Sequence, residues 1–322
     1  MSIRSFALKA WPLIALAATT TAVQAQSYPT RPIRLIVASS PGGPNDVVGR
    51  ILAQSCGEVL GQQIVVDNRA GAAGLIGAEL VARAAPDGYT LLLGFNGPLA
   101  IAPHLAGGTP YDPLKDFAPV AFAVNAPYVL VVNNALPVRS VKELVQLAKA
   151  QPGKLNYASG GAGGGLHLAA ELLNLAAGLV TVHVPYKGGG PGLTAVIAGE
   201  TQWMFSGLSA ALPLIKAEKV RALAIGGAKR SRVAPDMPTV AESGFQFSAS
   251  GWYGVLAPPR TPRAIVIRLH DAIAKVLNAP AMREKLADMA IEPDVSTPEE
   301  FAAMLREELA TWGRVIKAAG IR

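Results

Sequence analysis

The chain has 322 residues, of which 51% are hydrophobic and 16% are charged, and its formal net charge is +7. This composition indicates a globular protein with an ample core and excludes a disordered chain. The basic residues are spread along the chain without a stripe or interleaved aromatic residues, so we expect no nucleic-acid partner.

The N-terminus has the three parts of a secretory signal peptide. Arg4 and Lys9 form a basic region, residues 11–22 are apolar, and small side chains follow. The apolar segment is about 12 residues long, whereas a membrane-spanning helix needs roughly 20. We therefore expect residues 1–25 to be a signal peptide cleaved after Ala25, which leaves an exported, soluble mature protein with a net charge of +5.

One unit of secondary structure occurs twice: an apolar strand, a glycine-rich loop, an amphipathic helix, a second strand and a second glycine-rich loop. In the first copy the strands lie at 33–37 and 64–66, and a helix begins near Val47 between them. A further helix over 75–84 and an apolar strand at 89–94 follow. This order predicts a βαβαβ unit with a parallel sheet.

The second half of the chain alternates in the same way. A strand at 128–133 and a helix from Ser140 precede the second copy, whose strands at 155–158 and 180–184 flank a helix from about Leu166. The following pattern predicts a helix at 191–198, a strand at 202–205, a helix at 208–217, a strand at 221–226, a connecting stretch at 229–251, a strand at 252–257 and helices at 262–277, 281–289 and 298–319.

These elements predict an α/β protein of two lobes. We expect residues 26–124 and 253–322 to form lobe 1 and residues 125–252 to form lobe 2. The strands near 120–133 and 252–257 would cross between the lobes, and the helical tail would pack back on lobe 1.

The paired glycine loops are the main functional signal. From Gly42 to Gly71 is 29 residues, and from Gly160 to Gly188 is 28. Such loops leave free N–H groups at a helix N-terminus, which favours an anion. Two of them indicate two lobes that grip one small anionic ligand.

Enzyme motifs do not compete well with this interpretation. The glycines at 160–165 superficially resemble a dinucleotide fingerprint, but export argues against NAD or ATP, and neither a P-loop nor a G-x-S-x-G elbow is present. Ser159 and His167 lie eight residues apart without reason for a proton relay. Cys56 is expected to be a buried apolar side chain, and no Cys/His cluster has metal-ligand spacing. We expect no catalytic residue, metal or cofactor.

Several single residues keep two interpretations. Asp46 can cap its helix and brace the loop, or contact the ligand. His167 is favoured as a first-turn residue near the cleft over a general base. Lys187 can pair with a carboxylate or be solvated, and at least one of Trp252 and Tyr253 is expected to pack in the core.

Several short motifs follow one another along the mature chain. They include Pro41-Gly42-Gly43 with Asp46 and Arg50, Asp67-Asn68-Arg69-Ala70-Gly71, Pro86-Asp87-Gly88-Tyr89, His167-Leu168-Ala169 with Glu171, Val184-Pro185-Tyr186-Lys187-Gly188, Gly251-Trp252-Tyr253-Gly254 and Thr297-Pro298-Glu299-Glu300-Phe301. With these motifs the chain resembles the Bug/TctC family, the extracytoplasmic solute receptors of tripartite tricarboxylate transporters. The resemblance implies a periplasmic, monomeric protein with a type II-like Venus-flytrap fold, a small organic carboxylate as ligand and transporter membrane subunits as partners.

The resemblance also implies that main-chain groups and bridging waters of two facing loops hold the carboxylate. The positions carried over are Ser39, Ser40, Pro41, Gly42, Gly43 and Asp46 in lobe 1, and Ser159, Gly160, Gly161, Gly163, Gly164, Gly165 and His167 in lobe 2. Lesser candidates are Pro185, Tyr186, Lys187, Gly188 and Ser206.

The chain departs from the family at two places. The family usually has Pro-Phe-Pro-Pro-Gly-Gly where this chain has residues 38–43 with Ser39 in place of the aromatic residue, so we expect a larger and more polar pocket there. The family often has an acidic residue where this chain has Ser206. An amine-bearing ligand would lose its counter-charge, which disfavours amino acids.

The expected function is capture of a small carboxylate by hinge closure and its delivery to a tripartite tricarboxylate transporter. One alternative is a ligand-sensing receptor that feeds a two-component signalling system without transport. An exported enzyme is the third and least favoured.

Overall fold

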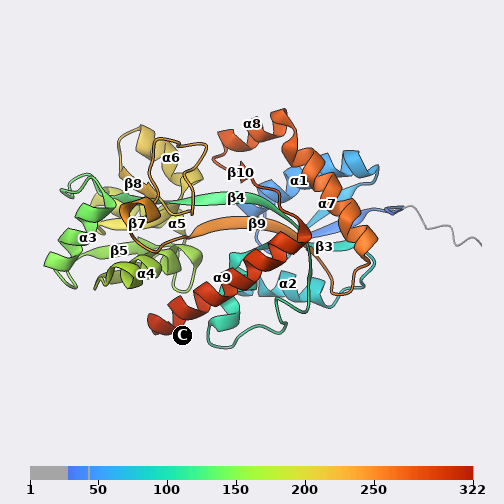
Figure 1. The fold of residues 1–322 in the computed structure, drawn as a ribbon, viewed down its shortest axis with the longest axis horizontal. Coiled ribbons are helices and arrows are strands. Elements are labelled where there is room, and N and C mark those ends of the chain that lie inside the picture. The colour runs from blue at the N-terminus through green and yellow to red at the C-terminus, as the bar shows by residue number, and fades with distance from the viewer. Residues whose placement is uncertain (1–27, 43, 322) are drawn as a thin grey trace, which may run out of the picture.

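The computed structural model describes residues 28–42 and 44–321. Within them, ten strands form one mixed sheet in the order β2-β1-β3-β9-β4-β7-β5-β6, and β8 and β10 pair with β4 off this path. Helices cover both faces of the sheet (Figure 1). The predicted signal peptide and its cleavage site lie outside the described residues, as does Gly43.

The first half of the sheet confirms the predicted βαβαβ unit. Strand β1 (Ile33–Val37) pairs in parallel with β2 (Ile64–Asn68) and with β3 (Thr90–Phe95). Helices α1 (Pro44–Leu60) and α2 (Leu75–Ala82) make the connections. Helix α1 begins three residues before the predicted start because proline is well tolerated in a first helical turn.

The second half repeats this arrangement. Strand β5 (Asn156–Ser159) pairs in parallel with β6 (Val182–Pro185) and β7 (Trp203–Gly207). Helix α4 (Gly165–Ala177) follows β5, and Gly178 ends it in the left-handed conformation. The remaining elements of this half are α3 (Val141–Ala150), α5 (Gly189–Ala198), α6 (Leu208–Lys216) and β8 (Arg221–Ile225).

Two strands join the halves, as predicted. Strand β4 (Ala118–Val132) pairs with β9 (Ser250–Ala257) over its first ten residues and with β7 over its last five. Strand β9 is antiparallel to both β3 and β4, which makes the sheet mixed rather than parallel throughout. The predicted strand at 128–133 is only the distal third of β4, because the apolar sequence continues back to Ala118.

The helical tail differs from the prediction in its last member. Helices α7 (Arg263–Asn278) and α8 (Pro280–Asp288) lie over the first half, followed by the short β10 (Glu292–Pro293). Helix α9 (Pro298–Ala318), which starts at a capping box of Thr297 and Glu300, packs on β4 and also on α4. The tail therefore contacts both halves and not the first alone (Figure 1).

The buried side chains show the same continuity. One apolar cluster joins Ile36 and Leu92 of the first half to Tyr157 and Leu168 of the second, with Trp312 of α9 among them. Cys56 is buried as predicted, and burial raises the pKa of its thiol to about 12. An unreactive thiol in a packed helix follows from this.

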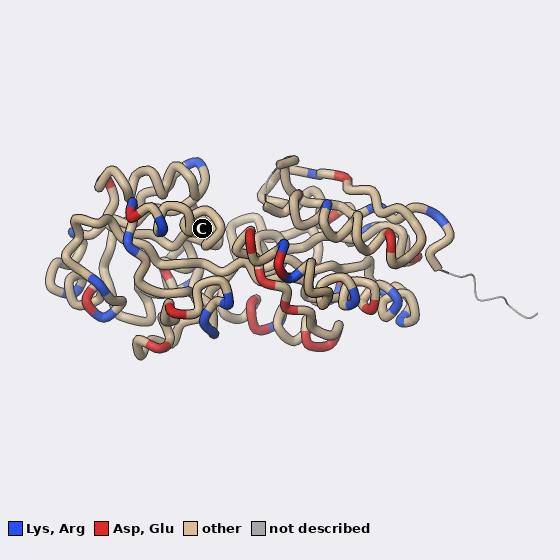
Figure 2. The backbone as a smooth tube through the Cα atoms, turned by 90° about the horizontal axis from the view of Figure 1, so that it is seen from above, with Lys and Arg blue, Asp and Glu red and all other residues tan. Residues whose placement is uncertain are grey.

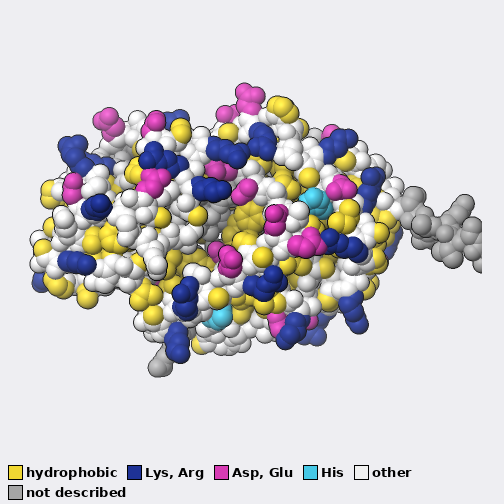
Figure 3. Space-filling view, viewed as in Figure 1, with side chains coloured by type: hydrophobic (Ala, Val, Ile, Leu, Met, Phe, Trp, Pro, Cys, Tyr) yellow, Lys and Arg dark blue, Asp and Glu magenta, His cyan; other side chains and the backbone are white. Residues whose placement is uncertain are grey.

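In the views drawn in Figure 2 and Figure 3, the charged residues of the described part of the chain are interspersed and do not gather by sign. Basic and acidic residues alternate along the backbone in Figure 2 and intermingle on the face seen in Figure 3. Among the described residues, no helix is long and apolar enough to cross a membrane.

The joint between α9 and the crossing strand gives a stability prediction. A Cβ added at Gly254 of β9 would clash with the Phe301 ring and lie 3.2 Å from the carbonyl oxygen of Ala121. We expect Gly254→Ala to lower the free energy of unfolding by roughly 1–3 kcal/mol, as overpacking does in cores. Denaturant unfolding measures it.

Gly190→Ala is the matched control, because no atom lies within 4 Å of the added Cβ there. Equal stability of the two variants would contradict the tight packing of α9 on β9.

Candidate functional site

A cavity lies where the two sets of parallel strands present their carboxyl ends to one another. Its volume is about 470 Å³. Ligands in open α/β sheets commonly bind at such strand ends. The residues that follow β1, β2 and β3 line one side, and those that follow β5 line the other: Ala38, Ser39, Ser40, Ala70, Gly71, Ala73, Gly74, Phe95, Asn96, Gly97, Ile101, Ala102 and Leu105, facing Ala162, Gly163, Gly164 and Gly165.

This cavity brings together part of the two predicted loops. Ser39 and Ser40 of the first loop face Gly163, Gly164 and Gly165 of the second. These five residues come from segments more than a hundred positions apart in the sequence. Their meeting is the arrangement expected of a site between two lobes.

No charged side chain lines the cavity among the described residues. An anion held there would have to be balanced by main-chain N–H groups and helix ends. Helix α4 begins at Gly165, and its N-cap residue Gly164 has no side chain to satisfy the first N–H groups. A helix N-terminus carries partial positive charge, so this end of α4 favours an anion.

The first loop is braced from outside the cavity by Asp46. Its Oδ2 accepts hydrogen bonds from the N–H of Gly42 at 2.9 Å and from Nε of Arg50 at 2.9 Å, and its Oδ1 accepts one from Nδ2 of Asn68 at 2.9 Å. The hydrogen bond from Arg50 lowers the pKa of this carboxyl to about 2. Asp46 is 3% exposed and does not line the cavity, which fits the bracing interpretation.

The first loop also presents one polar atom without a partner. The Ser39 hydroxyl oxygen is buried and forms no hydrogen bond with the described residues. The main-chain oxygen of the same residue accepts a hydrogen bond from Nδ2 of Asn68. Ser39 lines the cavity, but its hydroxyl oxygen is itself buried, so a more polar wall at this position stays a prediction.

The second loop is held by two side chains behind it. The N–H of Gly161 donates to Oγ of Ser159 at 3.1 Å, and the N–H of Gly163 donates to Nδ1 of His167 at 3.0 Å. Gly161 and Gly163 have φ angles of 136° and 74°, which only glycine adopts readily. Burial lowers the pKa of His167 to about 4, so the imidazole is neutral near pH 7.

The five lesser candidates lie away from the cavity, and seven of the main predicted contacts do not line it either: Pro41, Gly42, Asp46, Ser159, Gly160, Gly161 and His167. Tyr186 and Gly188 donate main-chain hydrogen bonds to the carbonyl oxygens of Ser159 and Gly160, so the stretch Pro185–Gly188 supports the loop from behind. Lys187 is exposed. Ser206 is 1% exposed and donates to the carbonyl oxygen of Gly207. The structure thus brings neither this stretch nor Ser206 to the cavity wall, and direct contact of these residues with a ligand stays a prediction.

The sequence analysis missed the residues after β3. Asn96 is 6% exposed, lines the cavity and donates through Nδ2 to the Tyr128 hydroxyl at 3.3 Å. A smaller cavity of about 230 Å³ continues past Phe95 and Asn96 toward Tyr128, Trp252 and Tyr253. The sequence could have indicated Asn96 by its position alone, because it follows β3 just as Ser39 follows β1, the parallel neighbour of β3.

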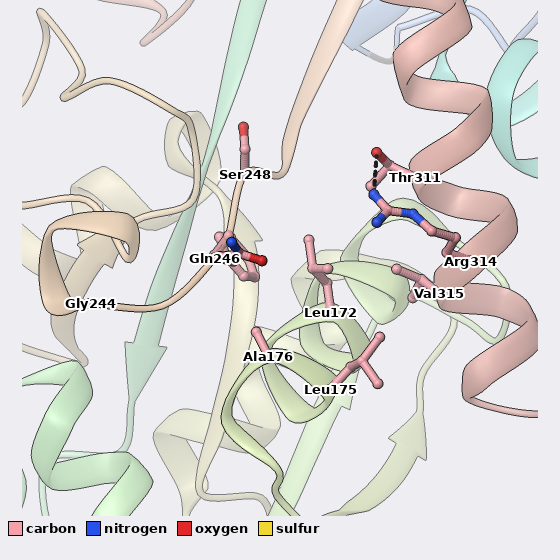
Figure 4. Close-up of a pocket in the computed structure, with 10 residues that line it drawn as sticks. Leu172, Leu175, Ala176, Gly244, Gln246, Ser248, Thr311, Arg314 and Val315 are labelled. Atoms are coloured by element: carbon pink, nitrogen blue, oxygen red, sulfur yellow. Dashed lines mark hydrogen bonds between the residues drawn. The ribbon is translucent and has the colours of Figure 1, made fainter.

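A larger groove lies elsewhere, between α4, the segment 244–248 and α9 (Figure 4). Its volume is about 770 Å³, and its wall combines Leu172, Leu175 and Val315 with the exposed Arg314. Its lining residues come from the later turns of α4 and α9 and from the segment that leads into β9. Among the described residues, no cluster of His, Cys, Asp or Glu could hold a metal ion.

Known proteins with this sequence pattern and fold are solute receptors. The model of the tripartite tricarboxylate transporter family receptor, TctC, matches residues 48–321. The chain is similar to an R. palustris protein solved with adipate, at 35% identity and a TM-score of 0.78 over 91% of this chain and 99% of that one. It is also similar to the periplasmic binding protein BugD, at 33% identity and a TM-score of 0.74 over 92% and 99%.

MatC from Rhodopseudomonas palustris, solved with bound malate, is another similar structure. Its identity to the chain is 32% and its TM-score is 0.74, over 90% of this chain and 100% of that one. Together these likenesses confirm the predicted two-lobed fold of periplasmic binding proteins and the predicted family resemblance.

The brace on the first loop gives a stability prediction. Asp46→Ala leaves the N–H of Gly42 and the amide of Asn68 without their acceptor, so we expect a loss of roughly 1–3 kcal/mol in the free energy of unfolding. Asp271→Ala is the control, because the side chain of Asp271 is 66% exposed. If urea unfolding gave the same midpoint for both variants, Asp46 would not brace the loop.

The buried histidine gives a pH prediction. Its folded pKa of about 4 lies below the usual value of 6.5. The unfolded chain therefore binds more protons between these values, and stability falls as the pH falls through this window. We expect the wild type to lose on the order of 2 kcal/mol more than His167→Asn between about pH 7 and pH 4.

Urea unfolding of both proteins at the two pH values measures this difference. Identical losses in wild type and His167→Asn would show that His167 does not titrate with a lowered pKa.

Proposed function

The chain belongs to the family of tripartite tricarboxylate transporter receptors, and from that premise we propose that it captures a small organic carboxylate in the cavity between Ser39–Ser40 and Gly163–Gly165. The observation that carries this proposal is a helix N-terminus without a side-chain cap that meets a glycine loop in a cavity where the described residues place no charged side chain. Similar proteins have been solved with adipate and with malate, which supports the same ligand class here.

Binding would rely on main-chain donors from both lobes. Hydrogen bonds from N–H groups to a carboxylate are charge-assisted and contribute roughly 1.5–3 kcal/mol each. The N–H groups at the start of α4 and those of the loop after β1 would approach the two ends or faces of one ligand. Rotation of the Ser39 side chain toward the cavity would let its unpaired hydroxyl contact a second polar group, such as a hydroxyl or another carboxyl.

Cationic ligands are disfavoured by the same wall. No acidic side chain lines the cavity in the described part of the chain. This chain also has Ser206 at the position where the resemblance implies a frequent acidic residue. An ammonium group would therefore be desolvated without an ionic partner. Tight binding of an amino acid, weakened in Ser206→Ala, would contradict this.

Capture would proceed by a hinge movement about the crossing strands. We place residues 26–124 and 253–322 in lobe 1 and residues 125–252 in lobe 2, so that β4 and β9 run through the boundary. A ligand that bridges the lobes binds the closed form better and shifts the population toward it. The closed form would then be recognised by the membrane subunits of a transporter.

The receptor would act outside the cytoplasm and without catalysis. The signal sequence at 1–25 supports export with cleavage after Ala25, and the similarity to a periplasmic binding protein supports the periplasm as destination. No reaction is proposed, because the cavity offers main-chain donors for an anion and, in the part of the chain that the structure describes, no charged side chain to transfer a proton.

Thermal unfolding of the mature protein, refolded free of ligand, tests the ligand class. A panel of mono-, di- and tricarboxylates includes adipate and malate as probes. A carboxylate at about 100 times its dissociation constant stabilises the fold by ~2.7 kcal/mol and raises the melting temperature. No rise with any carboxylate would contradict the proposal.

Charge variants at the cavity mouth locate the anion. Ala162 is exposed and lines the cavity, so Ala162→Asp places a negative charge beside the bound carboxylate. We expect the dissociation constant to rise about fivefold or more, because like charges a few ångströms apart repel by about 1 kcal/mol or above. The isosteric Ala162→Asn is the control. Equal affinity of the two variants in calorimetry would exclude this cavity as the anion site.

A further inference from the structure

Two histidines stack behind the glycine loop that follows β5. His167 of α4 and His183 of β6 have ring centroids 3.8 Å apart and planes inclined by 13°. Neither lines the cavity. Tyr157 of β5 stacks on His183 with centroids 4.9 Å apart, and its hydroxyl donates to the Glu171 carboxylate.

His167 has one hydrogen-bonding arrangement that fits its surroundings. Nδ1 lies 3.0 Å from the main-chain nitrogen of Gly163, which can only donate. Nδ1 must therefore be the unprotonated nitrogen, and Nε2 carries the proton. That proton lies on the side of Glu171, whose Oε1 is 3.8 Å from Nε2.

His183 reaches the same loop through a serine. Its Nε2 lies 2.7 Å from Oγ of Ser159, a residue with no exposed surface. The same Oγ accepts from the N–H of Gly161 at 3.1 Å and lies 3.2 Å from the carbonyl oxygen of Gly161. The hydroxyl thus holds Gly161 while His183 holds the hydroxyl.

The hydrogen bonds to Ser159 and His167 hold Gly161 and Gly163, the loop residues that need most ordering. Gly161 and Gly163 have positive φ angles, and glycine has the largest conformational freedom to lose. The loop leads directly into Gly164 and Gly165, which line the cavity. Burial lowers the pKa of both imidazoles to about 4, so both remain neutral at physiological pH and Nδ1 of His167 remains an acceptor.

We propose that His167 and His183, the latter through Ser159, are positioning residues that hold the 159–165 loop in its ligand-binding conformation before the ligand arrives. They touch the loop and not the ligand. A loop ordered in advance spends less binding energy on ordering, so affinity rises without a new contact. The inference rests on the proposed carboxylate site for its functional meaning, but the loop geometry can be tested without a ligand.

Amide hydrogen exchange of Gly161 and Gly163, followed by NMR in the ligand-free mature protein, measures the positioning directly. His167→Leu removes the acceptor, whereas His167→Asn keeps an acceptor near the place of Nδ1. We expect the Gly163 amide to exchange about tenfold faster in His167→Leu and to return to near the wild-type rate in His167→Asn. Ser159→Ala should speed Gly161 in the same way, and His270→Leu on the distant α7 should change neither amide.

Nitrogen-15 spectra of the imidazoles add a spectroscopic signature. We expect His167 at neutral pH to show an unprotonated Nδ1 and a protonated Nε2. The inference is overturned if Nδ1 is protonated, if His167→Leu leaves the exchange of Gly163 unchanged, or if His167→Asn exchanges as fast as His167→Leu.

Calorimetry with adipate and with malate then separates the inference from the proposed function. Where the wild type binds either probe, we expect its dissociation constant to rise about tenfold in His167→Leu and to recover in His167→Asn. Unchanged affinity in His167→Leu would overturn the functional role of the positioning. If the wild type binds no carboxylate of the panel, the proposed function fails, while the exchange rates still decide whether the histidines position the loop.

Discussion

Among the described residues, no charged side chain lines the cavity between Ser39–Ser40 and Gly163–Gly165, and the rest of the proposed mechanism depends on this constraint. An anion there can be neutralised only by main-chain dipoles, which are weak singly and act well only when several point at one place. Glycine lets the backbone come close enough to do so, but it also costs more conformational entropy to order than any other residue. The order must then come from side chains outside the cavity.

Side chains outside the cavity hold the loops on both of its sides. On the first side Asp46 accepts hydrogen bonds from the loop and from Arg50 and Asn68. On the second side Ser159 and His167 accept from the glycines of the loop. Polar side chains that look like ligand contacts in the sequence are therefore bound to the protein itself. Strand β4, about which we propose the hinge movement, runs through both halves and carries no charged residue. Helix α9 packs on both halves as well.

The sequence predicted the elements better than the roles of single residues. Strand 33–37 and the start of α2 at Leu75 were correct, because clean apolar runs bounded by glycine or proline leave little choice. The crossing near 120–133 was expected, but the strand itself was predicted only at 128–133, since the first residues of β4 look like any apolar connection. The π-helix Gly97–Ile101 was missed as well, and Asn96 before it became visible only when β3 was placed beside β1. Whether Asp46 and His167 touch a ligand or brace a loop depends on side-chain direction, which spacing does not encode.

A crystal structure of the mature protein with the carboxylate that raises its melting temperature most would test the central claim directly. We expect carboxylate oxygens to lie about 2.7–3.2 Å from main-chain nitrogens of both the segment 39–42 and the segment 163–166. We expect no lysine or arginine side chain to pair with them. A carboxylate held by a side-chain cation, or bound in the groove beside Arg314, would contradict the account.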